Sequence, residues 1–412
     1  MMLILSFLIW RLISTQTHKI ESLAEYKQVP LKSFFLGKPH FFKMDEKDAS
    51  VTTAECQYGY YPSIDIEDKE FETKLVGNYK RDGLAVITGV FTSSDCIQLI
   101  DSMLEYIEKL NTGVKRDEIK KTWLDFNLPP QTRPGLFQAL LSNMPAVWTI
   151  RGHEKVRKIF TTLYSSLRNK TVTDLMVSGD AINLRPNGID SPFVQGMDWA
   201  HLDQTTRNDT FKCIQGQAVL SNTTAGFRAS PGSHQIYQEI LDLCGHLPTD
   251  TSQWCKLRQE HYPAVRELIE SLPGGKFQIP ILAPRGSFIV WSSTTLHSAK
   301  LTDRVEIPTP EDPYNGWRAV IYVSMQPKTE WNDAQRMIRL RAFEENRTTN
   351  HCGWNLFEKK PGGAHLYKSS RHPMIEAMLR DPTLVYKQTK SKPILTAAQQ
   401  VLIGWRPSPF SK

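Results

Sequence analysis

The sequence is poor in cysteine, and the cysteines that it has are widely separated. Six of its 412 residues are cysteine, and no two of them form a Cys-x-x-Cys pair. The missing pairs argue against a zinc ribbon, which needs closely spaced thiolate ligands. Cysteines spread this thinly through a large chain are typical of reduced core residues, so we expect no disulfide framework.

Long apolar runs are also missing. The most apolar stretch, residues 1–10, is shorter than the ~20 residues that a membrane-spanning helix needs, and Arg11 follows it. As a signal peptide it would lack both a positively charged start and a cleavage site of small residues. We therefore expect a cytoplasmic protein without a transmembrane segment, in which this stretch forms a buried or interfacial helix. Secretion and membrane association are the alternatives.

Neither sign of charge dominates the chain. It has 50 Lys and Arg residues against 43 Asp and Glu residues, which gives a net charge of +7. This mild excess favours an anionic ligand, but no Lys/Arg block reaches the density of a nucleic-acid-binding arm. With 40% apolar and 10% aromatic residues the chain can build a large core. Its length allows two domains or one elaborated domain.

The stretch 199–205, Trp-Ala-His-Leu-Asp-Gln-Thr, carries the first candidate site. His201 and Asp203 stand two apart, so on an extended strand both side chains project to the same face. An imidazole beside a carboxylate supplies two ligands of the 2-His-1-carboxylate triad, which holds a non-haem Fe(II) and leaves coordination positions open. Because the His-x-Asp pattern is short, its interpretation depends on the residues downstream.

The residues downstream supply the rest of the pattern. Apolar runs rich in β-branched residues, bounded by Pro and Gly, predict further strands. A second histidine and an arginine stand at the ends of these strands. In chain order the features are the strand 213–220, the turn Pro-Gly-Ser-His at 231–234, the strand 284–291, His297, and the strand 317–324 with Arg318 at its start.

This order of ligands, strands and turns resembles the phytanoyl-CoA dioxygenase-like family of Fe(II)/2-oxoglutarate-dependent oxygenases, over about residues 77–355. The resemblance implies a mainly β fold with flanking helices, in which a double-stranded β-helix (jelly-roll) core has an N-terminal helical buttress. It implies Fe(II) held by His201, Asp203 and His297, with 2-oxoglutarate as cosubstrate. The implied reaction is a dioxygenase reaction that hydroxylates an unactivated C–H bond and releases succinate and CO2.

Arg318 is the implied ligand for the distal carboxylate of 2-oxoglutarate, because a guanidinium binds a carboxylate through two parallel hydrogen bonds. The chain departs from the family here, since Arg318 follows His297 by a longer interval than the family usually has. A proline-rich insertion, 303–316, accounts for the difference. Arg304 is the competing candidate. We prefer Arg318 because it lies in a predicted strand, whereas Arg304 has acidic and proline-rich surroundings.

Two amide side chains are further candidates for binding 2-oxoglutarate. Gln215 shares a strand face with Gln217, and a core-facing amide needs a hydrogen-bond partner. We predict that Gln215 lies beside the cosubstrate. Asn183 lies on a predicted strand shortly before the iron motif. It could contact the cosubstrate or satisfy a backbone group at the strand end, and the sequence does not decide between the two.

The expected substrate is a small molecule, either lipophilic or acidic. The residues around it would come from three connections without a recognisable signature, 111–150, 186–197 and 235–280, so the sequence does not name it. A nucleic-acid-modifying oxygenase with the same chemistry and a catalytically inactive jelly-roll binding module are the alternatives. His351, in the segment 350–354, is predicted to be a packing residue.

The chain divides into four predicted parts. Apolar residues at helical spacing predict a helix over 96–110, after an N-cap cluster at 92–95, and a second amphipathic helix over 150–167. Beyond residue 325 the chain becomes charged and helical. The predicted parts are an N-terminal arm (1–75), helix and strand support (76–169), the jelly-roll core (170–328) with a helical insertion (235–280), and a C-terminal helical extension (329–412).

Replacing Asp203 with alanine is expected to abolish hydroxylation, because the iron would lose its anionic protein ligand. Related halogenating enzymes have a small residue at this position, so the carboxylate favours hydroxylation. The measurement is 2-oxoglutarate turnover, followed as succinate released by wild-type protein and by Asp203→Ala. An unchanged rate in the variant would contradict the metal assignment.

Overall fold

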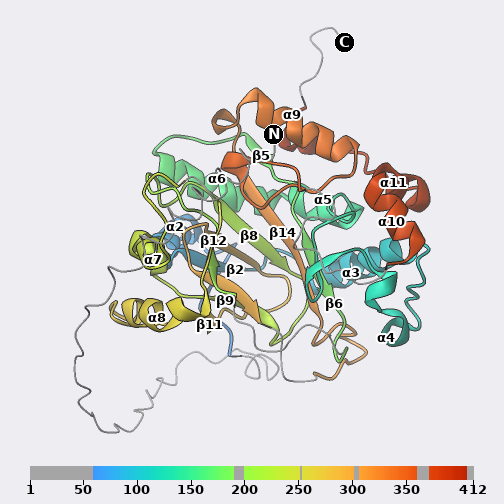
Figure 1. Cartoon of the computed structure of the whole chain (residues 1–412), viewed down its shortest axis with the longest axis horizontal. Coiled ribbons are helices and arrows are strands. Elements are labelled where there is room, and N and C mark those ends of the chain that lie inside the picture. Colours follow the sequence, from blue (N-terminus) through green and yellow to red (C-terminus); the bar gives the residue numbers. More distant parts are fainter. Residues whose placement is uncertain (1–58, 190–198, 251–252, 301–305, 360–370, 406–412) are drawn as a thin grey trace, which may run out of the picture. The chain divides into compact units, whose positions relative to one another are not determined.

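The chain is seen in a computed structural model, which describes residues 59–189, 199–250, 253–300, 306–359 and 371–405 (Figure 1). The apolar stretch 1–10 and most of the predicted N-terminal arm lie outside the described residues. Arg304 and most of the predicted loop 186–197 lie outside them as well. The boundaries predicted between the arm, the support, the core and the C-terminal extension are not tested by the structure and stay predictions.

Nine strands form the larger of two sheets. The strand order is β1-β2-β12-β8-β14-β6-β4-β3, and β5 pairs with β14 beside this path. Paired strands are antiparallel, except that β1 runs parallel to β2. The strands are β1 (Ser63–Asp65), β2 (Leu84–Thr88), β3 (Gln131–Arg133), β4 (Leu136–Phe137), β5 (Leu175–Val177), β6 (Ile182–Arg185), β8 (Ile214–Val219), β12 (Phe288–Ser292) and β14 (Arg318–Pro327).

Five short strands form the second sheet, in the order β10-β7-β13-β9-β11. All of its pairs are antiparallel. Its strands are β7 (His201–Leu202), β9 (Gly226–Ala229), β10 (Cys255–Lys256), β11 (Ile279–Pro280) and β13 (His297–Lys300).

Helices precede, interrupt and follow these strands. Two of them, α7 and α8, lie within the predicted insertion 235–280, and four follow β14 in the C-terminal part of the chain (Figure 1). The described α-helices are α2 (Phe71–Asp82), α3 (Ser93–Glu108), α4 (Ile119–Thr122), α5 (Pro145–Gly152), α6 (Glu154–Arg168), α7 (Tyr237–Leu243), α8 (Tyr262–Glu270), α9 (Asp333–Glu344), α10 (Pro373–Arg380), α11 (Thr383–Thr389) and α12 (Ala397–Leu402).

One face of the larger sheet is apolar and packs against helices. Alternate residues of the central strands, among them Ala218, Phe288 and Ile321, are buried in the main hydrophobic core. Helix α6 presents an apolar stripe to the same core, including Phe160 and Leu163, and lies against β14 (Figure 1). Burial of this stripe and of the sheet face provides the main hydrophobic stabilisation of the fold.

The opposite face of the larger sheet carries polar and aromatic side chains. The strand register places Trp291, Gln215 and Ser324 side by side, with Gln217 and Tyr322 in the next row. Residues of β9 in the second sheet pack with β12 from this side. The interior between the two sheets is therefore partly polar, and we call this surface of the larger sheet the inner face.

The predicted helix over 96–110 corresponds to α3, which begins with a capping box formed by Thr92 and Asp95. The helix predicted over 150–167 corresponds to α6, which begins at Glu154, and residues 150–152 belong to the preceding helix α5. The two helices are separated at His153, whose backbone is extended (φ −64°, ψ 131°). At Gly152 a Cβ would lie 2.6 Å from the Gln399 side chain, so close packing by α12 accompanies the break.

Two expectations from composition can be compared with the structure. The cysteines within the described ranges are free. The sequence predicted reduced cysteines and no disulfide framework. Among the residues that the structure describes, no helix combines the length and the apolarity needed to cross a membrane. The fold is rich in sheet and flanked by helices, as predicted.

Substituting Gly216 with alanine is expected to destabilise the fold by about 1–3 kcal/mol, the usual cost of overpacking a core. A Cβ at this position would lie 2.6 Å from the Phe288 ring and 3.0 Å from the Ile289 carbonyl oxygen. The matched control is Gly77→Ala on α2, where nothing lies within 4 Å of the added Cβ. The control should stabilise the helix by roughly 0.5–1 kcal/mol. Urea unfolding measures both changes, and equal midpoints for Gly216→Ala and wild type would contradict the packing described.

Candidate metal centre

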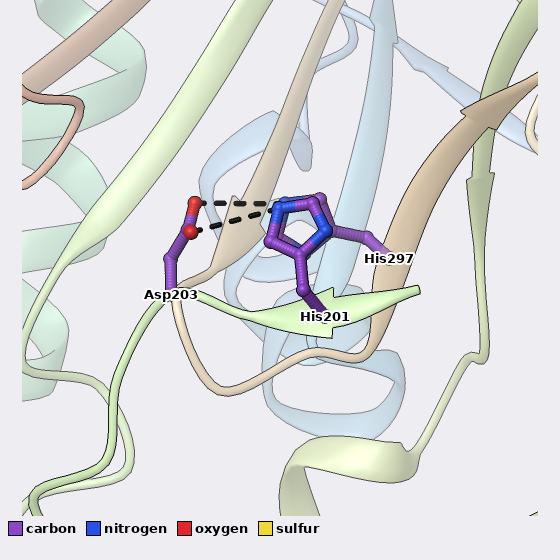
Figure 2. A group of neighbouring side chains, drawn as sticks. All are labelled: His201, Asp203 and His297. Carbon is purple, nitrogen blue, oxygen red and sulfur yellow. Dashed lines mark ion pairs between the residues drawn. The ribbon is translucent and has the colours of Figure 1, made fainter. Parts of the chain in front are cut away.

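Three predicted ligands come together between two strands of the second sheet. His201 lies on β7 and His297 on β13, and the two residues are direct partners across this antiparallel pair. Asp203 follows β7 and turns its carboxylate toward both rings (Figure 2). One ligand atom from each of the three side chains lies within 4.8 Å of the others. The sequence therefore predicted correctly that these three residues lie together.

The distances within the group suit a metal ion at its centre. The Asp203 carboxylate lies 3.6 Å from Nε2 of His201 through Oδ1 and 3.6 Å from Nε2 of His297 through Oδ2 (Figure 2). The centroids of the two imidazole rings are 4.2 Å apart. Both Nε2 atoms thus face the carboxylate, which is the arrangement in which three donors converge on one point.

Backbone carbonyls fix the orientation of both histidines. Nδ1 of His201 lies 3.0 Å from the Trp199 carbonyl oxygen, and Nδ1 of His297 lies 2.8 Å from the Thr295 carbonyl oxygen. A carbonyl oxygen only accepts hydrogen bonds, so each Nδ1 carries the proton and each Nε2 presents its lone pair. Such partners orient metal-binding imidazoles in proteins.

The protonation states of the histidines also fit a cation site. Burial lowers the pKa of His201, and it lowers the pKa of His297 to about 3. Both imidazoles are therefore neutral at physiological pH, which is the form that binds a metal.

Gln215 lies directly against the third ligand. Its Nε2 donates hydrogen bonds to Oδ2 of Asp203, at 2.8 Å, and to the backbone oxygen of His351, at 3.0 Å. The first of these bonds stabilises the ionised carboxylate and holds its direction. The predicted contact between Gln215 and the cosubstrate stays a prediction, but the side chain does lie at the candidate centre.

Arg318 is a buried cation at the start of β14. It is 3% exposed, Nη1 donates to the Ala225 carbonyl oxygen at 3.1 Å, and Nη2 lies 3.4 Å from the hydroxyl of Tyr322. Its Nε has no hydrogen-bond partner, and no carboxylate within the described ranges forms an ion pair with it. A guanidinium buried in this way is costly unless an anion pairs with it.

Asn183 lies on β6 opposite Val320 of β14, and it faces the same interior as Arg318. It is buried, and its Oδ1 has no hydrogen-bond partner. The structure gives the side chain no bond to a backbone group in the described part of the chain. The two alternatives for this residue, contact with the cosubstrate and satisfaction of a strand end, both stay predictions.

Several buried polar atoms of this interior lack a partner within the described residues. Buried polar groups are almost always paired in folded proteins, by protein atoms, by water or by a ligand. The atoms are Oδ1 of Asn183, Oε1 of Gln215, Oε1 of Gln217, Nε1 of Trp291, Nε of Arg318 and Nε2 of His351.

Sequence reasoning missed His351, which the structure places at this site. Nδ1 of His351 lies 3.1 Å from Oδ2 of Asp180. The centroid of its ring lies 5.7 Å from that of Trp291 and 5.6 Å from that of Tyr322, both on the inner face. The prediction that His351 is a packing residue is thus incomplete, because its ring also faces the interior beside the metal candidates. No spacing in the sequence connects it to the other residues.

Aromatic and basic side chains gather beside His201. The ring of Trp199 stacks on that of His201, with centroids 4.7 Å apart and an angle of 17° between the planes. Cζ of Arg133 lies 5.3 Å from the centroid of Trp199. Trp254, which is 47% exposed, has its ring centroid 6.2 Å from that of His201. Two of the connections predicted to border the substrate, 111–150 and 235–280, supply Arg133 and Trp254.

No family model matches the chain, and no curated protein matches it. Among solved structures, the hypothetical protein JW0805 from Escherichia coli is 16% identical, with 84% of this chain and 85% of that chain covered and a TM-score of 0.48. GlcNAc Inducible Gene 2, GIG2, from Candida albicans is 16% identical, with 85% and 84% covered and a TM-score of 0.44. The epimerase SnoN, solved in complex with Fe3+, alpha ketoglutarate and nogalamycin RO, is 13% identical, with 64% and 86% covered and a TM-score of 0.38. These TM-scores are below 0.5 and the identities are 16% or less, so the likeness assigns no function to this chain.

Substitution of either histidine ligand with alanine is expected to weaken Fe(II) binding. The loss should exceed the ~10- to 100-fold that removal of an outer partner of a metal ligand costs. Anaerobic calorimetric titration of Fe(II) into wild type, His201→Ala and His297→Ala measures the effect. The control is His246→Ala, which removes an imidazole paired with Asp250 and not part of the triad. Equal affinities in all four proteins would contradict a metal centre at this position.

Proposed function

We propose that the protein is an Fe(II)/2-oxoglutarate-dependent dioxygenase that hydroxylates an unactivated C–H bond of a small molecule. One observation carries the proposal. A 2-His-1-carboxylate group and a buried guanidinium without a carboxylate partner among the described residues face the same interior. The triad offers a site for a divalent metal, and Arg318 offers a site for a dicarboxylate that reaches toward it. In this proposal the two sheets form a double-stranded β-helix core.

The donor set fits Fe(II) that keeps positions open for reactants. Structural zinc sites are closed by four protein ligands, whereas the group here offers three. Two neutral imidazoles and one carboxylate are the facial set of non-haem iron oxygenases. Bound there, Fe(II) would activate O2, and the oxidation of 2-oxoglutarate to succinate and CO2 would balance insertion of one oxygen atom into the substrate C–H bond.

Arg318 would hold the distal carboxylate of 2-oxoglutarate. Its free Nε and its nearby Nη2 can donate two parallel hydrogen bonds to one carboxylate. The hydroxyl of Tyr322, beside Nη2, is a further polar group for the same carboxylate. An anion at this position would pair a charge that the protein otherwise buries alone, which favours binding of the cosubstrate.

The remaining residues of the centre keep the ligands oriented. The carbonyls of Trp199 and Thr295 hold the two imidazoles, and the Gln215 amide holds Asp203. Because these partners are fixed by the fold, the three donors need little rearrangement when a metal binds. Asn183 and Gln215 would also lie near the cosubstrate, since both side chains are buried on the inner face between the triad and Arg318.

The proposed substrate is a small molecule that combines an apolar body with an acidic group. Trp199 and Trp254 offer aromatic surface beside His201, and Arg133 offers a cation above Trp199. A nucleic-acid substrate and an inactive binding module are the other candidates. The presence of all three metal candidates and of Arg318 argues against an inactive module. A cytoplasmic location is part of the proposal.

The test is an anaerobic titration of the apo protein with Fe(II) and then 2-oxoglutarate, followed by the weak visible metal-to-ligand charge-transfer band. The wild-type protein should develop the band. Arg318→Ala should raise the Kd for 2-oxoglutarate at least ~30-fold, because truncating one partner of a buried charge pair costs roughly 2–5 kcal/mol.

The matched variant is Arg304→Ala, which removes the competing arginine. It should leave the Kd for 2-oxoglutarate unchanged. The reverse pattern would assign the carboxylate to Arg304, and a wild-type protein that binds iron without developing the band would overturn the proposed cofactor pair.

A further inference from the structure

A buried carboxylate–imidazole pair stands beside the metal candidates without belonging to the triad. Asp180 lies between β5 and β6, and the residue is 1% exposed. Neither of its carboxylate oxygens has a hydrogen-bond partner in the described chain, and Nδ1 of His351 is the basic group that pairs with it, at 3.1 Å. Since a buried carboxylate needs a compensating charge, this pair fixes the orientation of the His351 ring.

The orientation of the ring determines where its second nitrogen points. Nδ1 and Nε2 lie on different edges of an imidazole, so a ring that turns Nδ1 toward Asp180 directs Nε2 away from it. Nε2 of His351 is buried and has no hydrogen-bond partner. The rings of Trp291 and Tyr322, both on the inner face, flank the imidazole. An unpaired ring nitrogen is therefore held inside the interior that contains the metal candidates, and with Nδ1 turned to the Asp180 carboxylate it carries a hydrogen in the protonated, imidazolium form of the ring.

Contacts on both sides place His351 between the triad and Arg318. On the triad side, the backbone oxygen of His351 accepts a hydrogen bond from Gln215, the amide that also holds Asp203. Trp291, next to His351, has its ring centroid 5.5 Å from that of His297. On the other side, the hydroxyl of Tyr322 lies 3.4 Å from Arg318. A molecule that reached from the triad to Arg318 would pass the His351 ring.

The segment that carries His351 is anchored to the sheet. The Thr349 amide donates to the Gly179 carbonyl oxygen at 2.9 Å, and the Gly179 amide donates to Oγ1 of Thr349 at 2.6 Å. Asp180 follows Gly179 in the sequence, so these reciprocal bonds hold the segment of His351 next to Asp180. The imidazole is thus positioned before any ligand binds, and binding need not order it.

We infer that His351 is a 2-oxoglutarate-binding residue, whose Nε2–H donates a hydrogen bond to an oxygen of the cosubstrate between the metal and Arg318, and that Asp180 is its positioning residue. This inference rests on the proposed function. Burial lowers the pKa of His351, but the Asp180 carboxylate outweighs this effect and raises the pKa above its ordinary value. The donor is therefore better suited to an anion than a neutral imidazole would be.

The experiment compares Fe(II) binding and 2-oxoglutarate binding in wild type, His351→Phe and Asp180→Asn. Phenylalanine keeps an aromatic ring between Trp291 and Tyr322 but removes both nitrogens. Fe(II) affinity should stay within ~2-fold of wild type, and the Kd for 2-oxoglutarate, from the charge-transfer band, should rise about 10-fold or more, as expected for a lost hydrogen bond to a charged group. Asp180→Asn should show a smaller change in the same direction, and His351→Gln, which retains a donor, should recover part of the affinity.

The control pair is His246→Phe and Asp250→Asn, a second histidine–aspartate contact of the chain, at 2.6 Å, outside the triad. Each of these two variants should bind Fe(II) and 2-oxoglutarate with the affinity of wild type. Thermal unfolding identifies a variant that does not fold, and His351→Gln then takes the place of His351→Phe.

Two outcomes would overturn the inference. His351→Phe could bind 2-oxoglutarate as tightly as wild type, with or without slower substrate turnover, or it could lose Fe(II) as well, which would assign the residue to the metal centre. A wild-type protein that binds Fe(II) but no 2-oxoglutarate is a different result, because it rejects the proposed function itself.

Discussion

The pairing of β7 with β13 in one register is the constraint on which the candidate site depends. His201 and His297 are far apart in the sequence, and their rings lie 4.2 Å apart because the two residues are direct partners in this pair. Asp203 follows β7 directly, and its amide donates to the Ser293 carbonyl oxygen at 2.8 Å, which holds the residue beside His201. A slip of one residue would turn one histidine to the other face and separate the three ligands. Because β7 is bordered by β10 as well as β13, both of its edges are held.

The larger sheet separates stability from ligand binding by using its two faces differently. One face buries apolar side chains such as Phe288 and Ile321 against the helices, and this burial stabilises the sheet. The inner face carries Arg318, Gln217 and Asn183, which are buried with unpaired polar atoms. Unpaired groups of this kind destabilise the ligand-free protein, and an anionic cosubstrate would pair the Arg318 guanidinium. Local departures from ordinary packing rules are expected at functional sites.

The sequence predicted those features that depend on local pattern. The nearness of His201 and Asp203 follows from their spacing of two, although β7 ends at Leu202, and the place of Arg318 at the start of a strand follows from the apolar run after it. Features that depend on distant packing were not predictable. The break at His153 accompanies the packing of α12, a helix near the other end of the chain. The contact between Asp180 and His351 requires two segments without periodic pattern to lie side by side, and no spacing encodes it.

The position of His351 also changes how the C-terminal part of the chain is understood. Gln215 donates to Asp203 and to the backbone of His351 at once, so one amide couples the direction of a metal candidate to the position of this segment. Without the segment, Gln215 would lose an acceptor and Asp180 would lose its paired charge. Breaking a buried ion pair costs about 3–5 kcal/mol, a large part of the stability of an ordinary domain. The residues after β14 are therefore better understood as part of the structure that builds the site than as a separate appendage to it.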